Sequence, residues 1–489
     1  MEFNYQKLFL ALLPDLLVVV ALFAALGVDY SCLRGSRLAK RYQVACQISA
    51  AGLIAGLAVL VLQIAETMSV METSTADGQL VLTRSTLTLK ALLYAMGLGV
   101  LPLAKRDQIT PQVSEYFALL LLATLGMGFV VTSGNLLGAF VALELVSLSL
   151  YAMTVLNQAR RASAEAALKY LTFGAVASGF LLFGLSYLYG ATGQLDLTQM
   201  TGLQHSPLLV LAYLLIFVGL GFKLALAPFH LWAPDVYQNA PTPVAGWIGS
   251  GSKIAAAALL VAMLQPVFTS PELKAELIPA LAALAVASMV VGNLGALRQT
   301  NLKRLLAYSA IANAGYLLVG VVAFSAVGNT SVIFYILVYS LASLGAFGVV
   351  AVLTDTLGRD AEISDFNGCW KTTPGLAIAF LVFVLSLAGV PPLAGFLGKF
   401  YLFFAAIGAA PEAAAWYDGF YWLVAFALIM SVVSLYYYLR VLRAFLVVPA
   451  DDEVPVKTGW AAGITLCVLA IAVLALGLWP EPLLTLLRH

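Results

Sequence analysis

Charged residues are scarce in this sequence. Only 10% of its 489 residues are Asp, Glu, Lys or Arg, against about 25% in an ordinary soluble protein, and 62% are hydrophobic. The mean hydropathy is +0.97. A soluble domain of this length cannot bury so much apolar surface, and the long apolar runs lack the alternation of outer-membrane barrel strands. The composition therefore excludes a soluble globular enzyme and indicates an all-α polytopic membrane protein.

Histidine and cysteine are also rare. The chain has three histidines and four scattered cysteines, too few for a haem, iron–sulfur or zinc site built from this chain alone. No glycine-rich dinucleotide motif follows a strand-like run, and the net charge of +1 provides no basic excess for nucleic acid. We therefore expect no cofactor and no metal in this chain, and no nucleic-acid partner.

The long apolar runs are the dominant feature of the sequence. A helix needs roughly 20 predominantly apolar residues to cross the hydrocarbon core of a membrane. About fourteen runs meet this requirement: 8–28, 43–65, 85–104, 116–133, 135–156, 164–190, 207–232, 242–266, 277–297, 303–325, 331–353, 374–408, 417–445 and 460–479. The sequence therefore predicts about fourteen transmembrane helices.

The basic residues in the connections predict the orientation. Short loops on the inner side of a membrane carry an excess of Lys and Arg. With the N-terminus outside, sixteen basic residues lie in inner connections, whereas only Lys7, Arg84, Lys274 and Arg488 lie in outer segments. This asymmetry predicts a multi-pass membrane protein with both termini on the outer face, which is the periplasmic face for a protein of the bacterial inner (plasma) membrane.

Two of the predicted spans are interrupted by proline. Pro228 breaks the seventh span, and Pro391 and Pro392 break the twelfth, because proline lacks the backbone donor that a helix needs. Each break has a lysine nearby, Lys223 or Lys399. The breaks are five spans apart, an odd number, so units related by this offset must run in opposite directions. The pattern predicts inverted repeats of spans four to eight and nine to thirteen, as in many transporters.

The repeat predicts how the chain is divided. We expect an N-terminal three-helix segment at 1–110, a first five-helix repeat at 111–270, a second at 271–448, and a C-terminal helix at 449–489. Each repeat would form one half-channel. The second repeat has no acid to match Glu144 of the fifth span, and its last span has no lysine to match that of the eighth.

Four ionisable residues inside predicted spans are the candidate functional residues: Glu144, Lys223, Lys253 and Lys399. A charge at the bilayer centre costs about 2.5–3.5 kcal/mol on insertion scales, so several in one chain require a reason. A carboxylate holds a nearby lysine in its charged form, and moving or protonating that carboxylate releases the lysine's proton. These residues therefore indicate a proton path, with Glu144 and Lys223 as a natural pair. The alternative is a set of structural ion pairs.

Four further polar residues lie in or near predicted spans. Lys169 could act in the path or extend to the inner surface. His230 follows the first break, where its ordinary pKa of about 6.5 suits proton transfer, although a lone histidine is more often a core residue. Lys90 lies close to the outer end of its span, where we expect it to reach the surface. Asp15 could serve a helix contact or a path.

Three segments together resemble a known family. They are 219–244, which contains Phe-Lys-Leu-Ala-Leu-Ala-Pro-Phe-His, 298–309, which contains Thr-Asn-Leu-Lys-Arg, and 388–400, which contains Gly-Val-Pro-Pro-Leu-Ala-Gly-Phe. In this order they resemble the antiporter-like subunits of respiratory complex I, and the resemblance covers essentially the whole chain. Within that family the pattern is most similar to the N subunits of bacterial NADH–quinone oxidoreductase. Lysine rather than glutamate at position 399 argues against the M subunits, and the absence of a long C-terminal lateral helix argues against the L subunits.

The resemblance implies roles for the candidate residues. Glu144 matches the family's fifth-helix glutamate and Lys223 the lysine that it pairs with. Lys253 matches the lysine that links the two half-channels, and Lys399 matches the lysine of the second half-channel. Lys169 and His230 also match positions of the family, which favours a secondary role for them in the proton path.

The sequence thus predicts a proton-translocating, non-redox membrane-arm subunit of an enzyme complex, NADH–quinone oxidoreductase. The resemblance implies that partner subunits supply FMN, iron–sulfur clusters and quinone reduction. It also implies contacts with lipid, with small membrane subunits and with a second antiporter-like subunit. Two alternatives stay open at this point: an Mrp-type sodium/proton antiporter subunit and a structural scaffold subunit.

Overall fold

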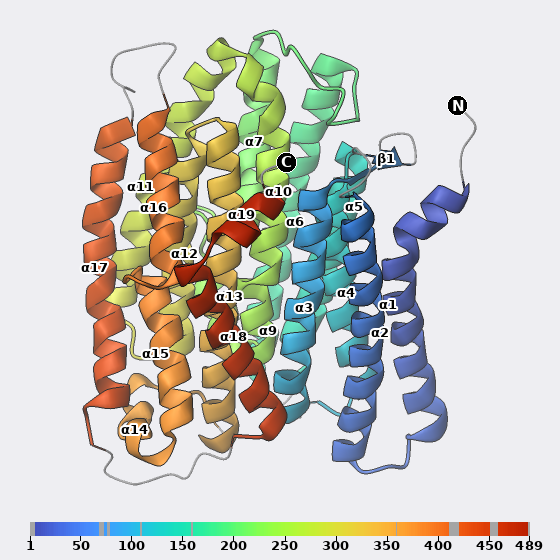
Figure 1. The fold of residues 1–489 in the computed structure, drawn as a ribbon, viewed down its shortest axis with the longest axis vertical. Coiled ribbons are helices and arrows are strands. Elements are labelled where there is room, and N and C mark those ends of the chain that lie inside the picture. The colour runs from blue at the N-terminus through green and yellow to red at the C-terminus, as the bar shows by residue number, and fades with distance from the viewer. Residues whose placement is uncertain are drawn as a thin grey trace.

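The structure is a computed structural model that describes residues 5–67, 73–75, 79–107, 110–157, 160–357, 359–409, 420–449 and 458–487. Helices dominate these residues (Figure 1). The α-helices are α1 (Tyr5–Cys32), α2 (Leu38–Thr67), α3 (Arg84–Asp107), α4 (Val113–Thr132), α5 (Leu136–Val155), α6 (Arg161–Thr192), α7 (Pro207–Leu224), α8 (Ala233–Asn239), α9 (Thr242–Gly249), α10 (Gly251–Leu264), α11 (Pro271–Leu297), α12 (Leu302–Val321), α13 (Ala326–Leu357), α14 (Cys369–Thr372), α15 (Pro374–Ala388), α16 (Ala394–Gly408), α17 (Tyr421–Leu446), α18 (Trp460–Leu478) and α19 (Glu481–Leu487). Short 3-10 helices cover Gln265–Thr269 (η1) and Ile363–Phe366 (η2), and β1 (Thr73–Thr75) pairs antiparallel with β2 (Leu80–Leu82).

The fourteen-span prediction is confirmed in the described residues. Thirteen segments are long and apolar enough to cross a membrane, with α9, α10 and η1 together forming one of them. The shorter apolar helices α15 and α16 share the twelfth predicted span. Arg488, which entered the orientation argument, lies outside the described residues.

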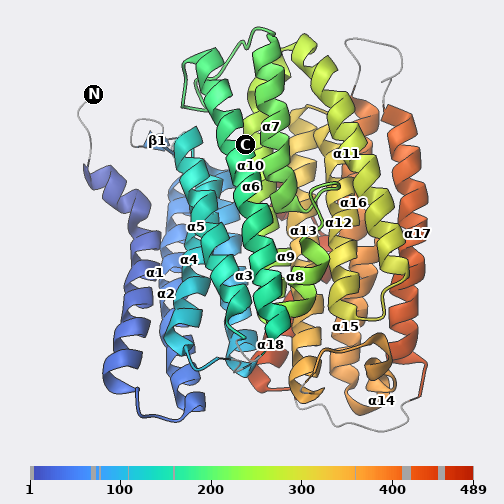
Figure 2. The same ribbon diagram turned by 180° about the vertical axis from the view of Figure 1, so that it is seen from behind.

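The spans stand side by side in an elongated bundle. Helices α1 and α2 lie at one end of its long cross-section and α17 at the other, with the remaining spans between them (Figures 1 and 2). Helices α12 and α13 are the most completely enclosed spans. Helix α18 crosses the face formed by α13, α15 and α16 obliquely. Helix α16, which carries Lys399, packs against both α12 and α13, and Lys399 is buried.

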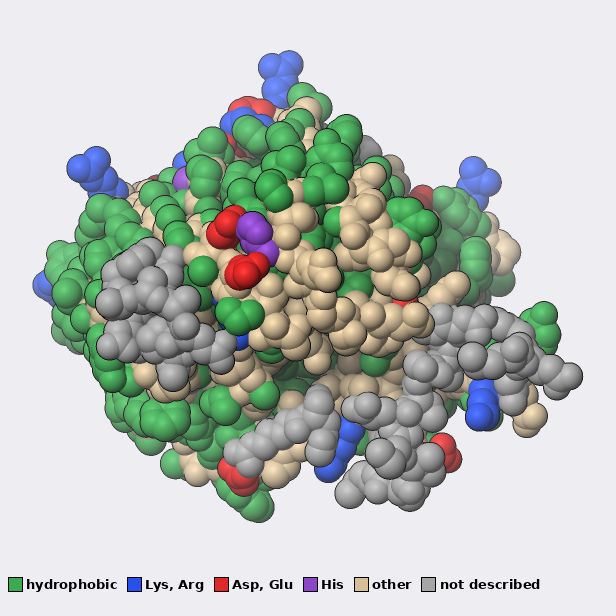
Figure 3. Space-filling view, turned by 90° about the horizontal axis from the view of Figure 1, so that it is seen from above, with side chains coloured by type: hydrophobic (Ala, Val, Ile, Leu, Met, Phe, Trp, Pro, Cys, Tyr) green, Lys and Arg blue, Asp and Glu red, His purple; other side chains and the backbone are tan. Residues whose placement is uncertain are grey.

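The two ends of the bundle differ in charge. One end, called here the basic end, carries the α1–α2, α5–α6, α11–α12 and α13–α14 connections. These connections and the helix ends beside them contain many of the Arg and Lys residues predicted to face inward. The opposite end carries only scattered charged side chains, and hydrophobic side chains surround it (Figure 3). The basic end is at the bottom of Figure 1.

The seventh span breaks where proline predicts it. Helix α7 ends at Leu224, and the next residue, Ala225, has a positive φ of 60°. The chain then turns irregularly through Pro228 before α8 completes the crossing. The predicted span 207–232 therefore consists of α7 and an irregular turn, and the short helix α8 begins directly after it.

The twelfth span breaks in the same way. Helix α15 ends at Ala388, and Gly389 has a φ of 83°, which favours glycine because it has no Cβ. Helix α16 then begins beside the end of α15, where a Cβ on Gly395 would lie 1.8 Å from the Ser386 carbonyl oxygen. The all-α fold with two inverted repeats and broken seventh and twelfth helices is thus confirmed. The predicted divisions near 110, 270 and 448 fall in connections between elements.

The eighth span contains an interruption that the sequence analysis does not predict. Helices α9 and α10 are separated by Ser250, whose φ and ψ of −121° and −78° lie outside the helical region. The carbonyl of Ser250 accepts a hydrogen bond from Ser340 Oγ of α13 at 3.2 Å. The same carbonyl also accepts from the backbone N–H of Lys253 at 3.1 Å, so the serine of α13 ties the interruption to a neighbouring span.

Candidate proton path

Lys223 lies in the last turn of α7, directly before the first break. Its ammonium group donates a hydrogen bond to Ser147 Oγ of α5. It also lies 5.4 Å from the ring centroid of Phe222 and 5.9 Å from that of Tyr151. A cation is favoured at this place because the C-terminal end of a helix carries partial negative charge. Lys223 is therefore held by a helix end, a hydroxyl and two aromatic rings.

Glu144 lies one turn from Ser147 on the same face of α5. Its carboxylate accepts a hydrogen bond from Ser178 Oγ of α6 at 2.6 Å, and the side chain is partly buried. Among the described residues, Glu144 forms no ion pair with Lys223 within 4 Å. Glu144 and Lys223, the predicted pair, are therefore not in direct contact. Ser147 lies one turn from Glu144 and is bonded to Lys223.

Lys253 is buried in the first turn of α10, just beyond the interruption at Ser250. Its ammonium group donates a hydrogen bond to the Ala310 carbonyl of α12 at 2.8 Å. It lies 5.7 Å from the ring centroid of Tyr339 on α13. Lys253 therefore joins the last span of the first repeat to two spans of the second.

Lys399 is buried on α16, against the second break. Its ammonium group donates to the Ala388 carbonyl at 3.0 Å and to Ser431 Oγ at 3.1 Å, and lies 4.7 Å from the ring centroid of Tyr316. The Ala388 carbonyl belongs to the last turn of α15, where carbonyls have no partner within the helix. The break thus provides the acceptor that holds this buried cation.

A small cavity lies beside Lys399. It is lined by Lys399, Asn313, Tyr335 and Tyr339, among others, and has a volume of about 10 Å³. A polar cavity needs roughly 10–15 Å³ to hold one water molecule. Tyr339 faces both this cavity and Lys253. Tyr339 therefore contacts Lys253 and also lines the space, the size of a single water, beside Lys399.

The two repeats differ at matching positions. Helices α5 and α12 both begin after an asparagine cap, Asn135 or Asn301. Glu144 lies nine residues after the first cap, and Ala310 lies nine residues after the second. Ala310 has no carboxylate, and its backbone carbonyl accepts the hydrogen bond from Lys253. Twelve residues after each cap stand a serine and an asparagine, Ser147 and Asn313. Helices α5 and α12 therefore differ chemically at two positions that lie close to the lysines.

Lys169 lies away from this line of residues, at the basic end. Its ammonium group pairs with Glu165 at 2.7 Å and with Asp235 at 2.9 Å, and its side chain is 41% exposed. Asp235 also pairs with Arg304 at 2.7 Å. The structure therefore places Lys169 in a network of ion pairs near the surface, in keeping with the expectation that it could extend there. Asp235 lies within the first family segment but was not among the predicted site residues.

His230 lies within the first break and is partly buried. Its Nδ1 is enclosed by protein and has no hydrogen-bond partner in the part of the chain that the structure describes. Buried polar atoms of this kind commonly bind water. His230 is thus close to Pro228, as predicted, but not bonded to any of the four candidate residues.

Lys90 does not reach the surface, so that expectation is wrong. Its ammonium group forms an ion pair with Asp15 at 2.6 Å, and both side chains are 3% exposed. The other Asp15 oxygen accepts a hydrogen bond from Tyr94 at 2.7 Å. This cluster joins α1 to α3 within the N-terminal segment. Two opposite charges in neighbouring apolar spans were the sequence signal for it.

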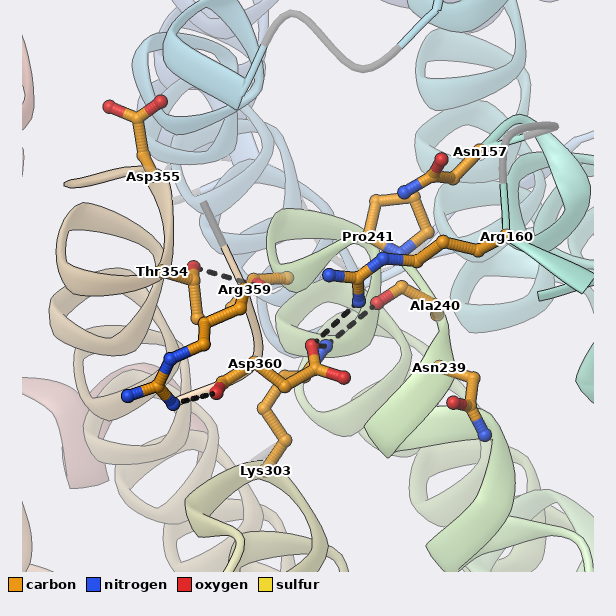
Figure 4. Close-up of a pocket in the computed structure, with 11 residues that line it drawn as sticks. Asn157, Arg160, Asn239, Ala240, Pro241, Lys303, Thr354, Asp355, Arg359 and Asp360 are labelled. Carbon is orange, nitrogen blue, oxygen red and sulfur yellow. Dashed lines mark hydrogen bonds and ion pairs between the residues drawn. The ribbon is translucent and has the colours of Figure 1, made fainter. Parts of the chain in front are cut away.

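A larger polar cavity of about 220 Å³ opens at the basic end (Figure 4). In its wall, Asp360 pairs with Arg160 at 2.9 Å and with the buried Lys303 at 3.2 Å. Burial opposes ionisation of Asp360, but these two cations outweigh it and lower the pKa of the carboxyl below its ordinary value. The connections after α5 and α13 are thereby tied together, which the sequence analysis does not predict.

Taken together, the fold and these residues define a class of protein: a polytopic antiporter-like subunit with two inverted repeats and a lysine at each helix break. The sequence model of the family described as NADH:quinone oxidoreductase/Mrp antiporter matches residues 133–434. The chain is 45% identical to NADH-quinone oxidoreductase subunit N 2 of Acidobacterium capsulatum, with 99% of each chain covered. It is 41% identical to subunit N 2 of Roseiflexus castenholzii over 77% of this chain and 76% of that one. The chain belongs to the subunit N family of NADH-quinone oxidoreductases.

Solved structures share the fold. A chain of respiratory complex I from Thermus thermophilus with bound aureothin is 35% identical and superposes with a TM-score of 0.80, covering 97% of this chain and 100% of that chain. A chain of the Mrp complex from Dietzia sp. superposes with a TM-score of 0.83 at 24% identity, covering 97% and 96%. The second likeness concerns the fold alone.

Proposed function

We propose that this chain is a proton-translocating, non-redox membrane-arm subunit of NADH–quinone oxidoreductase. The observation that carries this proposal is the placement of Lys223, Lys253 and Lys399 inside the bundle, two of them at helix breaks. An intramembrane ionisable residue is a functional candidate by default, because burial of its charge is costly. Membership in the subunit N family supports the same conclusion.

The contacts suggest how a proton is passed. Each of the three lysines is held by neutral acceptors: a serine hydroxyl for Lys223 and backbone carbonyls for Lys253 and Lys399. Glu144 places a carboxylate one turn of α5 from Ser147, the partner of Lys223. A change in the charge or position of Glu144 would change how strongly Lys223 holds its proton. A change in the charge of Lys223 would in turn affect Lys253 and Lys399 by electrostatic interaction. Lys169 and His230 would serve at the margins of this path.

The rest of the enzyme complex would lie in partner subunits. Among the described residues there is no group of three or more His, Cys, Asp or Glu side chains that could hold a metal ion. We propose that FMN, iron–sulfur clusters and quinone bind in partner subunits, and that this chain contacts small membrane subunits, a second antiporter-like subunit and lipid. Membership in the subunit N family, whose relatives include bacterial proteins, favours the inner membrane of a bacterium. The charge asymmetry of the connections favours an orientation with the basic end inside and both termini outside.

The test is proton pumping by the assembled complex carrying Lys223→Ala in proteoliposomes. We expect intact assembly, checked by the mass of the complex, together with a collapse of pumping and of coupled NADH turnover. Lys371→Ala, at an exposed lysine of the basic end, is the control and should pump normally. A normal proton-to-electron ratio in Lys223→Ala would refute the assignment and favour a scaffold. Sodium transport without NADH turnover would instead favour an Mrp-type antiporter.

A further inference from the structure

A buried polar network lies between Lys399 and the basic end. It is built from tyrosine, asparagine and serine side chains of α11, α12, α13 and α17. Asn293 is four residues from the basic end of α11, and Ser309 is seven residues from that of α12. Both are buried, at 0% and 1% exposure. The network therefore occupies the interior through which a proton would move between Lys399 and the basic end.

The first branch of the network begins at the small cavity beside Lys399. Tyr335 lines that cavity and donates its hydroxyl proton to Asn313 Oδ1 at 2.7 Å. Asn313 Nδ2 donates to the Ser309 carbonyl at 2.8 Å and to Ser309 Oγ at 3.3 Å. Ser309 Oγ in turn shares a hydrogen bond with the Tyr438 hydroxyl. The branch therefore passes through the asparagine amide.

The second branch begins at the ring that lies under the Lys399 ammonium, that of Tyr316. The Tyr316 hydroxyl accepts a hydrogen bond from Asn293 Nδ2 at 3.1 Å. Asn293 Oδ1 accepts one from the Tyr437 hydroxyl at 3.2 Å. This branch also passes through an asparagine amide, and it ends next to the first branch, because the ring centroids of Tyr437 and Tyr438 lie 4.5 Å apart.

An amide interrupts proton transfer along such a chain. A hydroxyl or carboxyl group can accept a proton on one lone pair while it releases its own. In an asparagine the donor is the NH₂ group and the acceptor is the oxygen, and the NH₂ group does not ionise. Asn293 and Asn313 can therefore orient the tyrosine hydroxyls on either side without passing a proton between them.

We propose that Asn293 and Asn313 insulate Lys399 from the basic end: they complete the buried hydrogen-bond network and block proton conduction through it. This inference rests on the proposed function, because a pump whose central site exchanged protons freely with one side would leak. The first repeat supplies the contrast. At the position that corresponds to Asn313 it has Ser147, a hydroxyl bonded directly to Lys223. The second repeat has an amide at this position, and the hydroxyl partner of Lys399 is instead Ser431 of α17.

The test replaces the amides by a conducting and by a non-conducting group of similar size. Asn313→Asp and Asn293→Asp introduce a carboxyl group, and Asn313→Leu and Asn293→Leu introduce none. Asn301→Asp is the matched control, because Asn301 caps α12 at the basic end and aspartate caps a helix equally well. Each variant is studied as the assembled complex in proteoliposomes containing a pH-sensitive dye.

Two quantities are measured. The first is the rate at which an imposed pH gradient decays without NADH, and the second is the number of protons pumped per NADH oxidised. We expect both Asp variants to dissipate the gradient faster than the wild type and to lose protons per NADH while they still oxidise NADH. The Leu variants and Asn301→Asp should keep the wild-type decay rate.

Three results would overturn the inference. The first is wild-type decay in both Asp variants. The second is equally fast decay in the Leu variants, because the leak would then come from disturbed packing. The third is loss of NADH turnover while the pH gradient decays at the wild-type rate, which would make the amides part of the pumping step. Each branch is tested separately, so one variant that fails to assemble leaves the other as the test. The decay is measured without NADH, so failure of the proposed function shows separately, as normal pumping by Lys223→Ala.

Discussion

Replacing Lys90 by methionine should destabilise the N-terminal segment without changing the proton-to-electron ratio of the assembled complex. The change leaves the Asp15 carboxylate buried, with only Tyr94 as a hydrogen-bond partner. Both partners of the ion pair are 3% exposed, so solvent cannot compensate for the missing cation. Loss of one partner of a buried ion pair costs about 3–5 kcal/mol.

The same contacts predict that the lost stability is regained when all three residues of the cluster are replaced. Asp15→Leu combined with Lys90→Met removes both charges but leaves the Tyr94 hydroxyl without its acceptor, at a cost of about 1–3 kcal/mol. Adding Tyr94→Phe removes that hydroxyl too. Replacing a buried ion pair by apolar groups of similar volume is often neutral or stabilising. The triple variant should therefore be close to the wild type.

The assay is the apparent melting temperature of the purified complex in one detergent, followed by release of this subunit. The expected order of stability is the single Lys90→Met variant lowest, then the double, then the triple variant. Lys371→Met, at an exposed lysine, controls for loss of a charge alone. A double variant less stable than the single one would refute the reasoning, and a triple variant that assembles but does not pump would show that the cluster belongs to the proton path.

Two further predictions concern the site and the basic end. Gly174→Ala places a Cβ 1.9 Å from the Tyr151 hydroxyl oxygen, so it should displace the ring beside Lys223. We expect a loss of about 1–3 kcal/mol in stability and reduced pumping. The control is Gly179→Ala, whose Cβ meets nothing within 4 Å and which should change neither stability nor pumping. The lowered pKa of Asp360 means that its ion pairs stabilise the fold above the ordinary carboxyl value of 3.8 and are lost as the pH falls through the lower folded value. Thermal melting between pH 3 and 7 should therefore show a smaller loss of stability in acid for Asp360→Asn than for the wild type, and equal losses would contradict the assigned ion pairs.

The sequence alone was sufficient for the architecture. The number of spans follows from the length of apolar runs, and the breaks in the seventh and twelfth spans follow from proline, because both effects act within one stretch of chain. The lysines at positions 223 and 399 could be singled out for the same reason, since a charge in an apolar run is visible without knowledge of its neighbours. The inverted relation of the repeats follows from the odd offset between the breaks.

The tertiary structure decided which side chains meet. Glu144 and Lys223 are neighbours without a direct ion pair, whereas Lys90 reaches Asp15 across 75 positions of sequence. The interruption of the eighth span at Ser250 also could not be predicted, because no proline lies at that position. Such contacts depend on how far each helix is rotated and shifted against its neighbours, and in a chain that is apolar on nearly every face the sequence pattern does not define that rotation.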